Sequence, residues 1–174
     1  MVSSPRCALV ESLSRYERLI EVGIGDRPEV ALALADRDRD VFAIDVDVGD
    51  RVREAEDGIR GRNGSRDGSL RAVRADVLAL ADERAQLTPS GALPRSVDAV
   101  YACNLPAELQ RPTVRLAARL DAACLFTTLG FEEPTVAVRR RSLDGTTLYV
   151  AREGTETGDS GADSEAGDGG AGSG

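Results

Sequence analysis

The chain has 174 residues, of which 41% are hydrophobic, and a formal net charge of −8. This length allows one domain with a real hydrophobic core, and no apolar run reaches the roughly 18 residues that a membrane-spanning helix needs. The sequence has no histidine and three widely spaced cysteines, which excludes structural zinc and any histidine-dependent acid–base chemistry. We therefore expect a cytoplasmic protein with reduced, mostly buried thiols, no metal ion and no membrane contact.

Most of the net negative charge lies at the C-terminal end of the chain. Six of the 30 acids lie at or beyond Glu153, where there is no base, so residues 1–152 hold 24 acids against 22 arginines. Residues 153–174 consist of glycine, serine and acids with scattered alanine and threonine, and they have nothing large to bury. We predict a compact domain over residues 1–152 and a disordered acidic tail over residues 153–174.

The compact part alternates between helical patterns and short buried strands. In its first half we predict a helix over residues 7–16, a strand over 18–22, a helix over 28–35 and a strand over 41–44. A helix begun at residue 49 should break at the glycine-rich stretch 58–69, before a strand over 70–75. In the second half we predict a helix over 77–85, a strand over 97–103, a helix over 105–119, a strand over 122–128, and a hairpin of strands 135–143 and 146–151. This alternation predicts an α/β fold of Rossmann type, a mainly parallel sheet with helices on both faces and a C-terminal antiparallel hairpin.

Polar groups follow four consecutive predicted strands, where ligands bind in sheets of this kind. The first strand ends in Glu21-Val22-Gly23-Ile24-Gly25, whose glycines allow a tight turn and a close backbone approach to a ligand. Asp45 ends the second strand and is suited to accept hydrogen bonds from ribose hydroxyls. Asp76 ends the third strand, beside the place of an adenine edge, and Asn104 ends the fourth, over the expected reaction centre. Each residue alone also fits a strand terminus or a helix cap, but together they indicate a nucleoside pocket.

The start of the helix after the glycines has features of its own. Asp26 and Glu29 have the spacing of a capping box, and Pro28 suits a first helical turn. Asp26 would oppose an anionic ligand group at this helix end, so we expect Arg27 to pair with it.

The ordering of these residues resembles class I methyltransferases that bind S-adenosylmethionine. Residues 13–152 resemble more closely a compact archaeal group, uncharacterised protein family 0146. The resemblance implies a methyltransferase-like fold, S-adenosylmethionine as cofactor and no metal. It places Glu21, Gly23 and Gly25 in the cofactor loop, Asp45 at the ribose and Asp76 on the adenine side. Asn104 is the catalytic candidate, because Asn-Leu-Pro partly matches the Asn-Pro-Pro-aromatic motif of amino-group methyltransferases.

Three functions stay open at this point. The first is a protein that binds S-adenosylmethionine or a related nucleoside, with or without methyltransferase activity, and the second is a non-catalytic Rossmann-like binding or interaction module. The third, an NAD-type dinucleotide-binding protein, is disfavoured because Pro28 stands where the last glycine of that motif belongs.

The sequence also indicates which partners to expect. A small nucleoside cofactor is expected, and a partner protein or a second copy is needed if loop 127–134, with its single aromatic Phe131, is the only second wall over the cofactor. Seven arginines could touch nucleic acid, although nearby acids favour a solvated loop instead: Arg51, Arg53, Arg60, Arg62, Arg66, Arg71 and Arg74.

Overall fold

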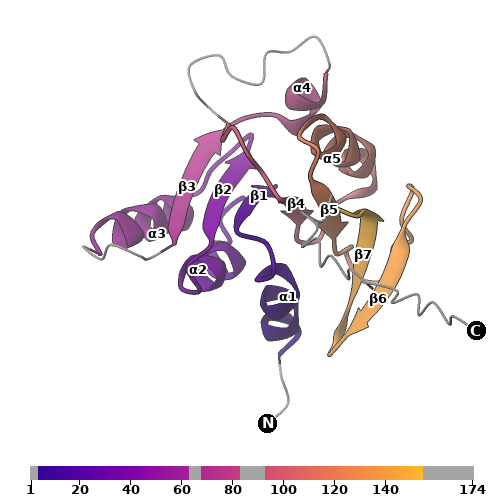
Figure 1. Cartoon of the computed structure of the whole chain (residues 1–174), viewed down its shortest axis with the longest axis horizontal. Helices are drawn as coiled ribbons and strands as arrows, with labels where there is room; N and C mark the ends of the chain where they lie inside the picture. The colour runs from indigo at the N-terminus through magenta and orange to yellow at the C-terminus, as the bar shows by residue number, and fades with distance from the viewer. Residues whose placement is uncertain (1–3, 63–67, 83–92, 155–174) are drawn as a thin grey trace, which may run out of the picture.

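The computed structural model describes residues 4–62, 68–82 and 93–154, and in these segments the chain forms one mixed sheet (Figure 1). The strands are β1 (Arg18–Val22), β2 (Asp40–Asp45), β3 (Ser69–Arg74), β4 (Ala99–Ala102), β5 (Ala123–Phe126), β6 (Arg139–Leu143) and β7 (Thr146–Arg152). Their spatial order is β3-β2-β1-β4-β5-β7-β6. The first five strands are parallel, and β7 runs antiparallel to both β5 and β6. The predicted parallel sheet with a C-terminal antiparallel hairpin is confirmed.

Helices cover both faces of the sheet, as predicted. Figure 1 shows α1 (Pro5–Leu13), α2 (Glu29–Ala35) and α3 (Asp50–Arg60) on one side of the sheet. On the other side lie α4 (Val77–Ala81) and α5 (Ala107–Arg119). Each face has its own cluster of buried aliphatic side chains, because β1, β4 and β5 are short apolar runs buried on both sides.

The sheet order fixes where a ligand site can form. The chain moves outward from β1 through β2 to β3, then returns to place β4 on the other side of β1. Strand ends on either side of this reversal leave a crevice at the carboxyl edge, where ligands bind in open α/β sheets. The end of β1 and the end of β4 are therefore the first places to look for a site.

Several boundaries differ from the sequence-based prediction. Helix α3 continues through Gly58 to Arg60, so the predicted break at residue 58 is wrong. Val52 and Ile59, seven residues apart, are both buried on one face of α3, and burying Ile59 outweighs the roughly 1 kcal/mol cost of a helical glycine. Strand β6 begins at Arg139 rather than residue 135, because the Thr135 N–H donates instead to Gln110 Oε1 on α5 (2.7 Å). Cys7 is exposed, contrary to the expectation of mostly buried thiols.

Two of the predictions fall partly on residues that the structure does not describe. Apart from Glu153 and Gly154, the predicted acidic tail lies outside the described residues, as do residues 83–85 of the helix predicted over 77–85. None of the helices in the described segments combines the length and apolar character that a membrane span requires.

Candidate functional site

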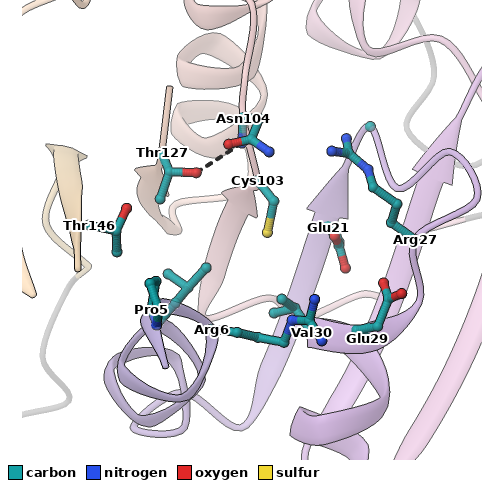
Figure 2. A pocket seen from close by; sticks show the side chains of 12 residues that line it. Pro5, Arg6, Glu21, Arg27, Glu29, Val30, Cys103, Asn104, Thr127 and Thr146 are labelled. Atoms are coloured by element: carbon teal, nitrogen blue, oxygen red, sulfur yellow. Dashed lines mark hydrogen bonds between the residues drawn. The ribbon is translucent and has the colours of Figure 1, made fainter. Parts of the chain in front are cut away.

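A cavity of about 250 Å³ opens at the topological reversal, between the carboxyl ends of β1 and β4 (Figure 2). Its floor is formed by Glu21 in β1 and Gly23 just after it, and by Cys103 and Asn104 after β4. One wall is the start of α2, with Arg27, Glu29 and Val30, and the opposite side is closed by Thr127 after β5 and Thr146 of β7. Helix α1 completes the enclosure with Pro5, Arg6 and Leu9.

Glu21 is the buried acid of this cavity, with only 2% of its surface exposed. The Tyr101 hydroxyl donates a hydrogen bond to its Oε2 over 2.6 Å, and the Cys103 thiol is a second hydrogen-bond partner. Burial raises the pKa of Glu21 to about 7, although the Tyr101 hydrogen bond and the charge of Arg27 act in the opposite direction. Near neutral pH this carboxyl can therefore either hold or release a proton.

Two neighbours of Glu21, Tyr101 in β4 and Cys103 just after it, stay neutral at that pH. Burial raises the pKa of both Tyr101 and Cys103 well above their ordinary values, and the nearby Glu21 carboxyl adds to both shifts. Cys103 is therefore a thiol rather than a reactive thiolate. In this cluster, Glu21 is the group that changes charge near pH 7.

The glycine turn after β1 is tied to the end of β2. Gly23 and Gly25 both have positive φ angles, of 77° and 55°, which suit glycine. The Gly25 N–H donates to Asp45 Oδ2 over 2.8 Å, and the Asp47 N–H donates to Asp45 Oδ1 over 3.0 Å. Asp45 therefore fixes the turn and remains half-buried at the strand end. The structure brings together Gly25 and Asp45, two of the residues singled out in the sequence.

Asp26 does not pair with Arg27, and it forms no capping box with Glu29. Its Oδ1 accepts the Arg51 backbone N–H (2.8 Å) at the start of α3, and the Arg51 guanidinium binds Glu29 (2.7 Å). This approach depends on Gly49, where an added Cβ would lie 2.2 Å from Asp26 Oδ1. The predicted cap and ion pair are thus wrong, because the carboxylate finds unsatisfied N–H groups on a neighbouring helix.

Asp76 and Asn104 have separate local roles. Asp76 caps α4 by accepting the Leu78 N–H over 2.8 Å, and it does not line the cavity. Asn104 does line it, with a positive φ of 56° that asparagine tolerates. Its backbone N–H donates to Thr127 Oγ1 over 2.9 Å, the dashed line in Figure 2. The link between Asn104 and Thr127 joins the ends of β4 and β5 beside the cavity.

Two exposed apolar side chains follow Asp45 and Asp76 in the chain, Val46 directly after β2 and Leu78 in the first turn of α4. Val46 is 57% exposed and Leu78 is 56% exposed. Residue 45 pairs with residue 74 in the parallel register of β2 and β3, so the two segments leave the sheet together. Exposed aliphatic groups beside carboxylates are suited to a planar base attached to a sugar.

Sequence reasoning missed part of the enclosure. Loop 127–134 was expected to be the only second wall, and its first residue, Thr127, does line the cavity, but Phe131 is fully exposed and does not. Instead, α1 and the start of β7 provide that wall. The sequence did contain one indication that α1 has a role in the site. Arg6 lies in the first turn of a helix that has no acid there, where the helix dipole disfavours a positive charge.

Most of the arginines in α3, in β3 and in the segment between them contact other groups of the protein. Arg51, Arg60 and Arg62 form ion pairs with Glu29, Glu56 and Asp36. Arg53 donates to the Val48 carbonyl, and Arg71 lies over the Phe42 ring. Arg66 lies outside the described residues. Two of the three ion-pair partners, Glu29 and Asp36, come before this region of the chain, and the solvated loop stays a prediction.

The fold is that of methyltransferases of known structure. An RNA methyltransferase from Salinibacter ruber, crystallised with S-adenosyl-L-homocysteine, matches with a TM-score of 0.53 and 15% identity, over 91% of this chain and 97% of its own. Magnesium protoporphyrin IX methyltransferase from Synechocystis PCC 6803, with bound S-adenosylmethionine, also matches at 0.53, with 13% identity over 83% of this chain and 78% of its own. The chain therefore has a methyltransferase-like Rossmann fold.

Sequence relatives then define the family. A UPF0146 protein of Halobacterium salinarum strain R1 is 38% identical over 154 residues, which is 88% of this chain and 99% of that protein. The sequence model of the Uncharacterised protein family (UPF0146) matches residues 66–153. The chain belongs to this family, as the resemblance in the sequence implied, and the family has archaeal members.

Within the described segments, no three cysteine, aspartate or glutamate side chains gather closely enough to hold a metal ion.

Proposed function

We propose that the protein binds S-adenosylmethionine, or a closely related nucleoside, at the carboxyl edge of its sheet and acts as a minimal methyltransferase. The observation that supports this proposal most directly is the hydrogen bond from the Gly25 N–H to Asp45, because it holds a carboxylate beside a tight glycine turn. In this proposal Asp45 accepts the ribose hydroxyls. Val46 and Leu78 contact the base, with Asp76 at its polar edge.

The residues present fit the methionine end of this cofactor. An added Cβ at Gly23 would have no atom within 4 Å, so the space beside this residue is open for a ligand. Glu21 lies on the floor of the same cavity, where its carboxylate form would stabilise a cationic group. When bound, the cofactor supplies a methyl group on a positively charged sulfur. The chain's own part is to orient that group over Glu21 and Asn104, and to exclude water with α1.

Two alternatives make different demands on the site. A non-catalytic binding module would use the same contacts to hold the cofactor without transferring a methyl group. An NAD-type protein would need a glycine for close helix packing where Pro28 now precedes α2. The proposed function is favoured over an NAD-type protein because the third glycine of the dinucleotide motif is missing. The turn has two glycines, which are followed by Asp26, Arg27 and Pro28.

Calorimetric titration of the purified protein tests the proposal. We expect S-adenosylmethionine and S-adenosylhomocysteine to bind with one site per chain, and NAD to bind far more weakly. Asp45→Ala should weaken both nucleosides by roughly ten- to a hundred-fold, the effect of losing hydrogen bonds to a charged group worth about 1.5–3 kcal/mol. Asp40→Ala, at the opposite end of β2, is the matched control. Unchanged affinity in a folded Asp45→Ala variant would remove Asp45 from the site.

A further inference from the structure

Glu21 is a buried acid without a bound counter-charge. Its side chain lines the cavity and is almost fully buried. Both of its hydrogen-bond partners, the Tyr101 hydroxyl and the Cys103 thiol, are neutral groups. Among residues 4–62, 68–82 and 93–154, Glu21 forms no ion pair, although the charge of Arg27 acts on it. A buried carboxylate without a paired cation is costly, so without a ligand the protonated acid is favoured.

The other charged groups around this acid keep their charge near neutral pH. Figure 2 shows Glu21 near the centre of the lining residues, with Arg27 and Glu29 on its α2 side. A hydrogen bond to its own backbone lowers the pKa of Glu29, and the charges of Arg51 and Arg6 lower it further. Glu29 is therefore ionised at neutral pH, and arginine stays charged in proteins. Since the hydroxyl and thiol partners stay neutral, Glu21 is the group of this set that changes charge near pH 7.

The proposed cofactor would bring the counter-charge that Glu21 lacks. Its amino-acid end carries an ammonium group, and the space beside Gly23, on the same cavity floor, is open for that end. A cation close to a buried carboxyl favours the carboxylate over the acid. We propose that the cavity takes the ammonium end of its ligand only with Glu21 as a carboxylate, so that binding releases the Glu21 proton to solvent. This inference rests on the proposed function.

The direction of the pH effect follows from this coupling. Below pH 7 most of the free protein holds a proton on Glu21, and only the remaining fraction is ready to bind. The apparent affinity is reduced by that fraction, so it should fall about ten-fold from pH 8 to pH 6. Over the same range, the number of protons released per bound ligand should rise from about zero to about one.

Calorimetric titration of the full chain in buffers of different ionisation enthalpy measures affinity and proton release together. We expect both effects at pH 6, 7 and 8 with S-adenosylhomocysteine, which has the ammonium group. The comparison ligand is 5′-methylthioadenosine, which keeps the adenine, ribose and thioether but lacks the amino-acid end. Either no measurable binding of this ligand, or binding without proton release, agrees with the proposal.

Two variants assign the proton to its residue. Glu21→Gln keeps an oxygen for the Tyr101 hydroxyl and cannot ionise, so at pH 8 it should bind S-adenosylhomocysteine about ten-fold or more weakly than wild type. Its affinity should not change with pH, apart from any titration of the ligand itself. Glu17→Gln makes the same substitution at an exposed acid just before β1, away from the cavity, and should behave as wild type. Circular dichroism checks that both variants are folded.

Other outcomes overturn the coupling and separate it from the proposed function. If S-adenosylhomocysteine binds with constant affinity and no proton release, the coupling is wrong while the cofactor site stands. It is also wrong if 5′-methylthioadenosine releases as many protons, or if the release persists in Glu21→Gln. If no nucleoside binds at any of these pH values, the proposed function fails and the coupling fails with it.

Discussion

Glu21 shows how one residue can serve both the fold and the site. It lies opposite Tyr101 in the parallel register of β1 and β4, so the two side chains meet across 80 positions of sequence. The groups that face it are Tyr101 in β4 and Cys103 just after it, with Arg27 just before α2 and Glu29 at its start. Burial outweighs the hydrogen bonds and Arg27, and the pKa of the carboxyl rises to about 7.

This raised pKa makes stability depend on pH in a definite direction. Between the ordinary value of 4.5 and about 7, the folded protein holds a proton on Glu21 that the unfolded chain has lost. The Glu21 contribution to the free energy of unfolding is therefore full below pH 4.5, falls as pH rises to about 7, and is flat above that. Its total is on the order of 3 kcal/mol.

Urea unfolding of the wild type and of Glu21→Gln across pH 4.5–8 measures this contribution. Glutamine keeps an oxygen for the Tyr101 hydroxyl and cannot ionise, so the variant should gain stability relative to wild type as pH rises. A stability difference that stays constant over this range would mean that Glu21 titrates in the folded state as it does in the unfolded chain.

At this scale the sequence predicted the positions of the polar groups better than their contacts. Asp45 was identified from its place after an apolar run, and Glu21 from the glycine segment and the family resemblance. The Tyr101 hydrogen bond was not foreseeable, because it depends on which strands become neighbours. The wrong pairing of Asp26 has the same cause, since its partner Arg51 is 25 residues further along the chain.

Among the elements, α1 forms one side of the cavity, and the β6–β7 turn packs against its first residue, Pro5. Gly145 in that turn has a φ of 77°, and a Cβ added there would lie 2.6 Å from Pro5 Cγ. The turn and the helix start therefore pack without space for a side chain. The position of Arg6, the next residue, follows from this contact.

Gly145→Ala should destabilise the protein more than Gly130→Ala does. Gly130 also has a positive φ, of 55°, but a Cβ there would meet nothing within 4 Å. We expect a loss of about 1–2 kcal/mol for Gly130→Ala from backbone strain alone. Overpacking against Pro5 should bring the loss for Gly145→Ala to about 2–4 kcal/mol. Equal losses in denaturant titrations would show that the Pro5 contact contributes nothing.

Element types were predictable because β2, β4 and β5 contain continuous apolar runs and the amphipathic helices repeat apolar residues at helical spacing. The residues at which elements begin and end were harder to predict. Helix α3 passes Gly58 because Ile59 packs on the sheet, and β6 starts late because Thr135 is bound to Gln110 of α5. Both depend on tertiary contacts that local patterns do not contain.

For the whole molecule, the division into a domain and a tail remains a prediction. Glu153 pairs with Arg139, and Gly154 lies against Ala123, so a truncation should leave both in place. Removing residues 155–174, which have no large apolar side chain, should change the melting temperature by less than about 4 °C, the scale of about 1 kcal/mol. A larger fall at matched salt would show that these residues pack on the domain.

The central claim is that a nucleoside cofactor binds where Asp45 meets the glycine turn. A crystal structure of the protein with S-adenosylhomocysteine tests it most directly. The account predicts ribose hydroxyls within hydrogen-bond distance of Asp45, the adenine against Val46 and Leu78, and the homocysteine end in the cavity above Glu21 and Gly23. A ligand bound elsewhere on the chain, or an empty carboxyl edge in crystals grown at saturating nucleoside, would contradict it.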